Sequence, residues 1–417
     1  MPDYKLHTPN GVNDILPAEC GIKKEIETTI QAVFASAGYG EVETPMFEYY
    51  DCYAGRSGQI SQENLYKFFD EQGRVLALRP DFTTSIARMA ATKDTNRPAP
   101  LRYMYTGSVF RAEQTDGARR REFTQSGIEL IGSCSAAADA EVIALAIEAV
   151  LSAGIEELTM EIGQVAFFNG LVEQVGLNSD DAEKLRERID SKDVVGIRDI
   201  LKSLPIDKDV KQLIEELPYL FGDISIIDKA RVAGLNETSK VALDNLRDIY
   251  NYLCDYGYEK YVSVDLGMLQ SIDYYTGSIF KCYTYDVGFP ICAGGRYDNL
   301  MGNFGAPKGA VGAAIGINRI MSALKRDGEI DRGAVMMYAE KGAAKSAHEV
   351  AAMLRQNGYI VENYINGGEY ADAEKLGKMR GIACIIRIFA DGNTELHDLI
   401  TDETTSTTIE EFVGAYE

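Results

Sequence analysis

The chain has 417 residues, of which 46% are hydrophobic and 25% are charged, a composition typical of a globular protein with two or three domains. Its formal net charge of -22 disfavours non-specific binding to the phosphates of nucleic acid. No apolar run approaches the ~18 residues of a membrane helix, and the N-terminal stretch lacks the apolar segment of a signal peptide. We therefore expect a cytoplasmic protein without membrane contact.

The cysteines and histidines argue against a metal centre. Seven cysteines are scattered without a CxxC pair, and the three histidines, His7, His348 and His397, lie far apart in the sequence. Structural zinc needs closely spaced ligands, and a disulfide framework usually has an even number of cysteines. We expect no metal, no cofactor and no disulfide framework, and cysteines that act as small buried apolar residues.

In chain order, apolar residues recur at helical spacing from Ile22 to Phe34, and Gly38 and Gly40 then end the helix before a predicted strand. Such a helix and strand suit a dimer element or a core element equally well. Residues 64–132 then read as strands, with a hairpin turn at 71–73.

A strongly periodic helix at 139–154 and a strand at 158–165 complete an antiparallel-rich α+β core. Residues 165–260 repeat helical periods and look like an insertion into the sheet. Strand patterns return from 261 to 295, and 309–328 reads as a strand that runs into a helix.

A polar, glycine-bearing linker precedes Gly333. Residues 333–417 alternate strand and helix, which predicts a small α/β domain. This part has 4 lysines and 3 arginines against 14 acidic residues, a poor surface for RNA phosphates. The predicted boundaries are therefore 1–325 for the core, with the insertion at about 165–260, and 333–417 for the second domain.

Polar residues follow the strand predicted before residue 80. Arg79, Asp81 and Thr83 alternate, so Asp81 and Thr83 are expected on one face of a strand end. There Asp81 suits a ligand ammonium, although an aspartate beside Pro80 also suits a turn.

Two further strands carry polar pairs. Arg111 and Glu113 share one strand face, and Gln125 and Glu129 share a face of the returning strand. Cross-strand neighbours bring such side chains together, and charges inside strands are costly unless they line a site. Between these strands, residues 119–121 are three arginines, which suit either a solvated loop or contacts to phosphate.

Tyr274 and Tyr275 offer flat apolar faces with polar tips, although tyrosine pairs of this kind are more often core residues. Gly294 and Gly295 allow close backbone approach beside Arg296.

Together these stretches resemble the class II aminoacyl-tRNA synthetase core, in particular its histidyl branch, over roughly residues 7 to 325. Five segments match in order: 9–17 with 41–48 (motif 1), 110–132 (motif 2), 271–280 and 293–300 (the histidyl signatures) and 309–320 (motif 3, containing Arg319). The resemblance implies a homodimer through motif 1, an insertion at 165–260 and an anticodon-binding-like tail.

The resemblance also implies site residues. The following residues are expected to hold an amino acid: Asp81, Thr83, Gln125, Glu129, Tyr274 and Tyr275. The following match ATP contacts: Arg111, Glu113 and Arg319.

Four departures from the synthetase pattern bear on activity. The family has an arginine at the position of Gln270, where it stabilises the reacting carboxylate and α-phosphate. A fixed cation there contributes several kcal/mol to the transition state, so adenylation should be severely weakened. Ala293 replaces a glycine and Asn318 replaces a glutamate, and "RPDFT" stands where the family has a Glu-Gly pair.

A histidine pocket without the activating cation resembles the regulatory subunits of ATP phosphoribosyltransferase. This resemblance implies a non-catalytic subunit within a hetero-oligomer, with a short-form catalytic subunit as partner and histidine as allosteric ligand, in the first step of histidine biosynthesis. Histidine then binds either in the old substrate pocket or at the subunit junction, and contact with tRNA is not expected. The alternatives are an active histidine-tRNA ligase that tolerates Gln270 and a stand-alone amino-acid-binding protein.

Overall fold

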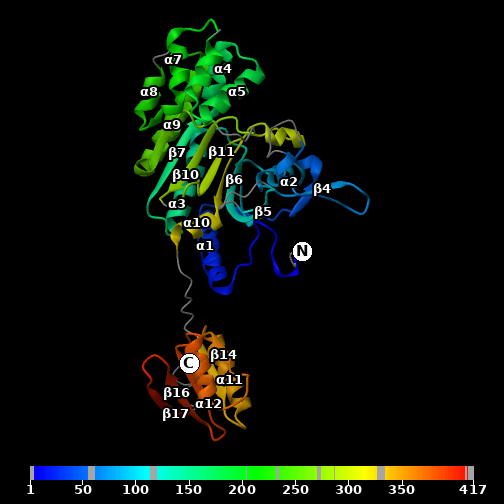
Figure 1. Ribbon diagram of the computed structural model, residues 1–417, viewed down its shortest axis with the longest axis vertical. Helices are drawn as coiled ribbons and strands as arrows, with labels where there is room; N and C mark the ends of the chain where they lie inside the picture. The colour runs from blue at the N-terminus through cyan, green and yellow to red at the C-terminus, as the bar shows by residue number, and fades with distance from the viewer. Residues whose placement is uncertain are drawn as a thin grey trace. The chain divides into compact units, whose positions relative to one another are not determined.

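The computed structural model describes residues 4–54, 62–112, 120–202, 204–231, 234–269, 274–285, 287–325, 334–408 and 411. The chain divides into two compact units, Met1–Asp327 and Gly328–Glu417 (Figure 1). No helix within these described ranges is long and apolar enough to cross a membrane.

The first unit is built on a nine-stranded sheet with the order β1-β5-β6-β12-β11-β10-β7-β9-β8 among the described residues. The strands are β1 (Gly40–Glu41), β5 (Leu101–Phe110), β6 (Glu122–Ile131), β7 (Leu158–Gln164), β8 (Phe221–Gly222), β9 (Val262–Asp265), β10 (Ser278–Thr284), β11 (Cys292–Arg296) and β12 (Ala310–Gly316). From β5 to β7 every neighbouring pair is antiparallel. These middle strands form the surface on which the site is built.

Helices α1 (Pro17–Ser36), α3 (Ala136–Ser152) and α10 (Ile317–Leu324) pack on one face of this sheet. Ile26, Ile30 and Phe34 of α1 are fully buried there, as the predicted helical spacing requires. Ser135 begins α3 by accepting a hydrogen bond from the backbone N–H of Ala138.

The opposite face carries α2 (Thr83–Lys93) and a small sheet of β2 (Phe47–Tyr49), β4 (Val75–Leu78) and β3 (Lys67–Phe69). Successive strand residues point to opposite faces, so Met104 packs with α1 whereas Tyr103 and Tyr105 pack with α2. This α2 face is therefore aromatic, and it holds the cavity described below.

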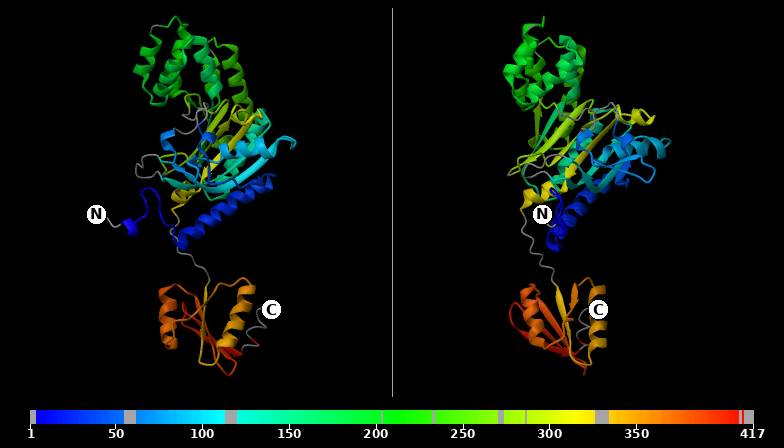
Figure 2. Two further views of the ribbon diagram at one scale, coloured as in Figure 1. Left: turned by 90° about the vertical axis from the view of Figure 1, so that its right-hand side faces the viewer. Right: turned by 45° about the vertical axis from the view of Figure 1, so that its right-hand side comes forward.

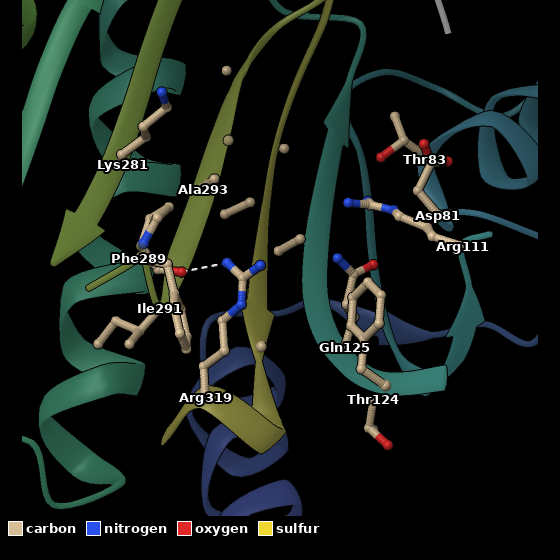
Figure 3. A pocket seen from close by; sticks show the side chains of 18 of the residues that line it. Asp81, Thr83, Arg111, Thr124, Gln125, Lys281, Phe289, Ile291, Ala293 and Arg319 are labelled. Atoms are coloured by element: carbon tan, nitrogen blue, oxygen red, sulfur yellow. Dashed lines mark hydrogen bonds between the residues drawn. The ribbon is translucent and has the colours of Figure 1, made fainter. Parts of the chain in front are cut away.

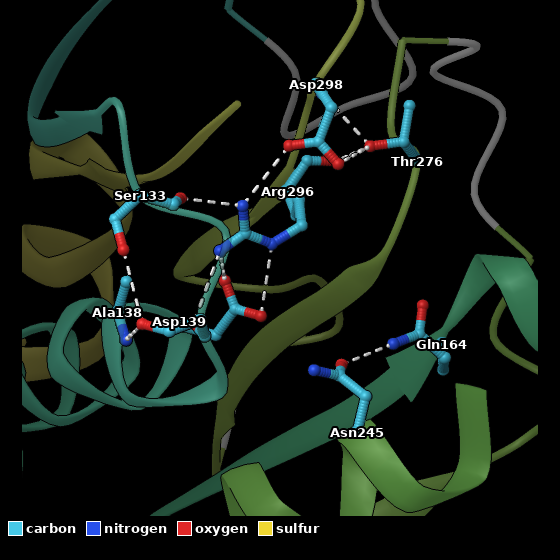
Figure 4. A network of polar contacts seen from close by, with 9 residues as sticks. Ser133, Ala138, Asp139, Gln164, Asn245, Thr276, Arg296 and Asp298 are labelled. Atoms are coloured by element: carbon cyan, nitrogen blue, oxygen red, sulfur yellow. Dashed lines mark hydrogen bonds and ion pairs between the residues drawn. The ribbon is translucent and has the colours of Figure 1, made fainter. Parts of the chain in front are cut away.

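The insertion leaves the sheet at the end of β7 and returns at β9. Its helices are α4 (Val165–Val175), α5 (Ser179–Asp190), α6 (Val194–Leu201), α7 (Lys208–Glu216), α8 (Ser225–Arg231) and α9 (Glu237–Asp255), which gather beyond one end of the sheet (Figure 2). Gln164 at the end of β7 donates a hydrogen bond of 2.8 Å to Asn245 of α9 (Figure 4). This bond, together with a shared apolar core, joins the insertion to the sheet.

The second unit is a five-stranded sheet in the order β14-β13-β15-β16-β17. Its elements are β13 (Val335–Ala339), α11 (Ala344–Gln356), β14 (Val361–Asn363), α12 (Tyr370–Met379), β15 (Cys384–Ile388), β16 (Asn393–Asp398) and β17 (Thr404–Thr408). Helices α11 and α12 cover opposite faces. The antiparallel β16 and β17 were not predicted, because β17 is nearly all threonine and Leu396 is the single aliphatic residue of β16, so neither shows an apolar alternation.

Candidate functional site

A cavity of about 440 Å³ opens on the α2 face of the nine-stranded sheet (Figure 3). Its lining comes from β6, β10, β11, β12, the start of α2 and the segment before β10. Figure 3 shows two sides, with Asp81, Thr83 and Arg111 on one and Lys281 and Phe289 on the other.

Glu129 of β6 is the most buried acid in the cavity, with 1% of its surface exposed. Its carboxylate accepts a hydrogen bond of 2.7 Å from the Thr83 hydroxyl and another from the Tyr297 hydroxyl. Burial, assisted by repulsion from Asp81, raises the pKa of Glu129 to about 7, although the two hydrogen bonds act in the opposite direction. Near neutral pH the Glu129 carboxyl is therefore only partly ionised, and a bound ligand can change the fraction that is charged.

Asp81 supplies a second carboxylate to the same end of the cavity. Burial raises its pKa, while the positive charge of Arg111 lowers it. The predicted position of Asp81 and Thr83 on a strand end is wrong, since β4 ends at Leu78 and Thr83 is the first residue of α2. Both nevertheless line the cavity, because the chain turns there and directs the start of α2 toward Glu129. Neither carboxylate forms an ion pair with a residue that the structure describes, so the two together favour a cationic ligand.

Glycine on β12 creates the space for Glu129. Gly312 is the cross-strand partner of Glu129, and a Cβ at Gly312 would lie 1.8 Å from the Glu129 carboxylate oxygen. Gly127 leaves similar room for the ring of Tyr105. The register of β6 with β12 thus determines where the carboxylate lies.

Gln125 presents an unused hydrogen-bond acceptor. It lies two pleats from Glu129 on the same face of β6, and it lines the cavity. Its side-chain oxygen is buried and has no hydrogen-bond partner among the residues that the structure describes. An unsatisfied buried acceptor costs about 1–3 kcal/mol, so a ligand N–H placed here would be stabilising.

Tyr274 and Tyr275 form an aromatic wall just before β10. Their ring centroids lie 4.7 Å apart, and Tyr274 also meets Tyr297 edge-on at 5.8 Å. Burial raises the pKa of both tyrosines, so both phenols are neutral at physiological pH.

Two arginines of the cavity are anchored in the same way. Arg111 donates to the carbonyl of Pro80 at 3.0 Å and lies over the ring of Phe123. Arg319 of α10 donates to the carbonyl of Pro290 and lies over the ring of Phe289. Both guanidinium groups line the cavity and are held in place by these carbonyl groups.

Not every predicted site residue can be placed. Gln270, Glu113 and Arg119 lie outside the described residues. Arg120 does line the cavity, and it forms a long ion pair of 4.0 Å with Glu19.

Arg296, by contrast, is structural. It is buried against Asp139 at 2.5 Å and Asp298 at 3.2 Å, and it also donates to the carbonyl of Ser133 (Figure 4). Gly294 and Gly295 on the same strand line the cavity.

The comparison with known proteins identifies the family. A family model described as histidyl-tRNA synthetase matches residues 11–320. A protein of Acetivibrio thermocellus named "ATP phosphoribosyltransferase regulatory subunit" is 46% identical over 100% of this chain and 100% of its own length. The chain belongs to the family of ATP phosphoribosyltransferase regulatory subunits. A member from Ruminiclostridium cellulolyticum, with the same name, is 40% identical over 98% of this chain and 99% of its own.

Solved structures agree with this family membership. An ATP phosphoribosyltransferase regulatory subunit/histidyl-tRNA synthetase from Bacillus halodurans superposes with a TM-score of 0.84 at 34% identity, covering 93% of this chain and 100% of that one. A histidyl-tRNA synthetase from a Nostoc species shares the fold at 22% identity, with a TM-score of 0.81 over 98% of both chains. The predicted class II α+β fold and the predicted family are therefore confirmed.

Sequence reasoning missed several residues of this regulatory subunit's cavity. Tyr297 adjoins Arg296 in the second signature, and Gly312 lies in motif 3. Lys281 is a residue of β10, the strand that comes after the paired tyrosines. The register of β10 with β11 makes Lys281 a neighbour of Ala293, and the order of the strands brings Tyr297 and Gly312 to Glu129.

One group of possible metal ligands lies in the second unit, among the described residues. Glu374, His397 and Asp402 offer ligand atoms within 4.8 Å of one another. The ammonium of Lys378 lies 2.8 Å from Glu374 and 3.5 Å from Asp402. The lysine thus already supplies the positive charge that a metal ion would bring, and we assign no metal to this group.

Proposed function

We propose that this chain is a non-catalytic allosteric subunit that binds histidine in the cavity and controls a short-form catalytic subunit of ATP phosphoribosyltransferase. The partner is a glycosyltransferase that joins ATP to phosphoribosyl pyrophosphate in the first step of histidine biosynthesis. It requires this chain for activity and is inhibited by histidine through it. The names of the relatives support the regulatory role over the alternative of a histidine-tRNA ligase.

The observation that carries the ligand assignment is the pair of buried carboxylates beside an unused acceptor. Asp81 and Glu129 favour a cation, and the oxygen of Gln125 needs a donor. Histidine offers an ammonium group and an imidazole ring, which together supply both. We therefore place histidine in the cavity and not at the junction with the partner.

Binding without chemistry is sufficient for regulation. Coupling free energies between sites are typically ~1 to 3 kcal/mol, so occupancy of one site changes the binding affinity at the other by roughly 5- to 150-fold. We place a homodimer of this chain inside the hetero-oligomer, as the resemblance of residues 9–48 to motif 1 implies.

Two measurements on the purified chain test this function. Calorimetric titration with histidine should show saturable binding, which Glu129→Gln weakens at least tenfold. Histidine-dependent exchange of pyrophosphate into ATP should stay at background. Robust exchange would establish the ligase instead, and absence of histidine binding would refute the assignment of the cavity.

A further inference from the structure

Lys281 is a cation of the cavity without a fixed partner among the residues that the structure describes. It lies on β10 between Glu161 of β7 and Ala293 of β11, and it lines the side of the cavity across from Asp81 (Figure 3). Its ammonium forms no ion pair and no side-chain hydrogen bond with any residue in the described parts of the chain. A lysine with three donors on a flexible stem can reach toward either side of the strand.

Three carboxyl groups of neighbouring elements interact electrostatically with Lys281, and one of them, Glu161, is its cross-strand partner. Glu161 belongs to β7, Asp265 ends β9, and Asp190 ends helix α5 of the insertion. Burial raises the pKa of each carboxyl, and the charge of Lys281 lowers each of them. Lys281 therefore interacts with acids of the sheet and with an acid of the insertion, and it also lines the cavity.

Asp190 is the acid of these three that belongs to a helix of the insertion. Each of the three acids has one further cation nearby, which is Lys192 for Glu161 and Asp265 and Arg186 for Asp190. Asp190 also lies at the C-terminus of α5, where the helix dipole disfavours a negative charge. Loss of the Lys281 charge should therefore loosen the last turn of α5 first.

We propose that Lys281 contacts the anionic group of the ligand and thereby couples occupancy of the cavity to helix α5 of the insertion. An anion in the cavity competes with Asp190 for the ammonium of Lys281. Ligand binding therefore weakens the attraction between Lys281 and helix α5 of the insertion. This inference rests on the proposed function for the identity of the ligand, because histidine brings a carboxylate as its anionic group.

The ligand contact is tested with two ligands and two variants. Histidinol has the imidazole and the amine of histidine but no carboxylate. In Lys281→Met the affinity for histidine should fall about five- to tenfold while that for histidinol stays unchanged. Lys260→Met removes an exposed lysine that does not line the cavity, and it should behave as wild type with both ligands. Equal histidine affinities of the two variants would overturn the contact.

The coupling is tested by amide hydrogen exchange of α5. Histidine should speed exchange in the last turn of α5 in wild type and Lys260→Met. In Lys281→Met the exchange should already be fast without ligand and should not change when histidine is added. Exchange in ligand-free Lys281→Met equal to that of wild type would overturn the coupling. Since this last comparison needs no ligand, it separates failure of the coupling from failure of wild type to bind histidine.

Discussion

The hydroxyl of Tyr297 donates a hydrogen bond to the buried carboxylate of Glu129, from a position 168 residues further along the chain. Strand β6 carries the acid, and the segment that follows β11 carries the phenol. The bond closes one wall of the cavity and opposes the effect of burial on the pKa of Glu129. Four predictions follow from this wall and the network beside it.

Glu129→Gln should change how stability depends on pH. The folded protein holds this carboxyl at a pKa of about 7, above the value of 4.5 for an exposed glutamate, so folding favours its protonated form. Between these two pH values the free energy of unfolding of wild type should fall as pH rises, by roughly 3 kcal/mol in total. The variant lacks this decline. Urea unfolding at several pH values measures the difference, and parallel profiles for the two proteins would refute the assigned pKa.

Gly312→Ala should displace the Glu129 carboxylate, since the new methyl group would overlap its oxygen at 1.8 Å. We expect at least a tenfold loss of histidine affinity, about 1.4 kcal/mol, and a loss of stability of about 1–3 kcal/mol. Gly302→Ala is the matched control, because a Cβ there meets no atom within 4 Å. Calorimetry and urea unfolding of both variants provide the comparison. Equal histidine affinities would show that Gly312 has no role in the site.

Tyr297→Phe should raise the pKa of Glu129 further, because the donor that stabilises the ionised carboxylate is removed. Near pH 7 more of the protein would then carry a neutral Glu129, and histidine affinity should fall roughly tenfold. The loss should shrink as the pH is raised toward about 8.5, where the carboxyl ionises again. Tyr285→Phe, at a tyrosine that is 75% exposed, is the control. A loss that does not change with pH would mean that Tyr297 acts through packing alone.

Arg296→Met should destabilise the first unit by about 3–5 kcal/mol, because it leaves Asp139 as a buried charge without its partner. The exposed pair of Lys345 and Glu349 offers a contrast, and Lys345→Met should cost less than about 1 kcal/mol. Thermal or urea unfolding measures both. A small effect of Arg296→Met would contradict the structural role given to the second signature. Histidine affinity of the folded variant should change little, since Arg296 does not line the cavity.

Much of the fold could be predicted because each element carries a local pattern. The helical spacing from Ile22 to Phe34 and the strand-to-helix transition near Gly316 both appear where the sequence indicates them. The hairpin of β16 and β17 was missed, since it is held by backbone pairing with little apolar alternation.

The site was only partly readable from sequence. Gln125 and Glu129 share a strand face, so alternation alone places them together. Gly312 and Tyr297 reach Glu129 only because β12 lies between β6 and β11, and that strand order is a long-range property. Asp81 shows the opposite case, because it lines the cavity although the strand geometry predicted for it is wrong. The role of each of these five residues in histidine binding remains a prediction.

The most direct test of regulation is an assay of phosphoribosyl-ATP formation by a short-form catalytic subunit. The catalytic subunit is assayed by itself, with wild-type chain added, and with the Glu129→Gln variant added. Each assay is run with and without histidine. We predict that formation requires this chain, that histidine inhibits it, and that Glu129→Gln supports formation yet resists inhibition at least tenfold. Formation that is indifferent to this chain, or inhibition that Glu129→Gln leaves unchanged, would contradict the account.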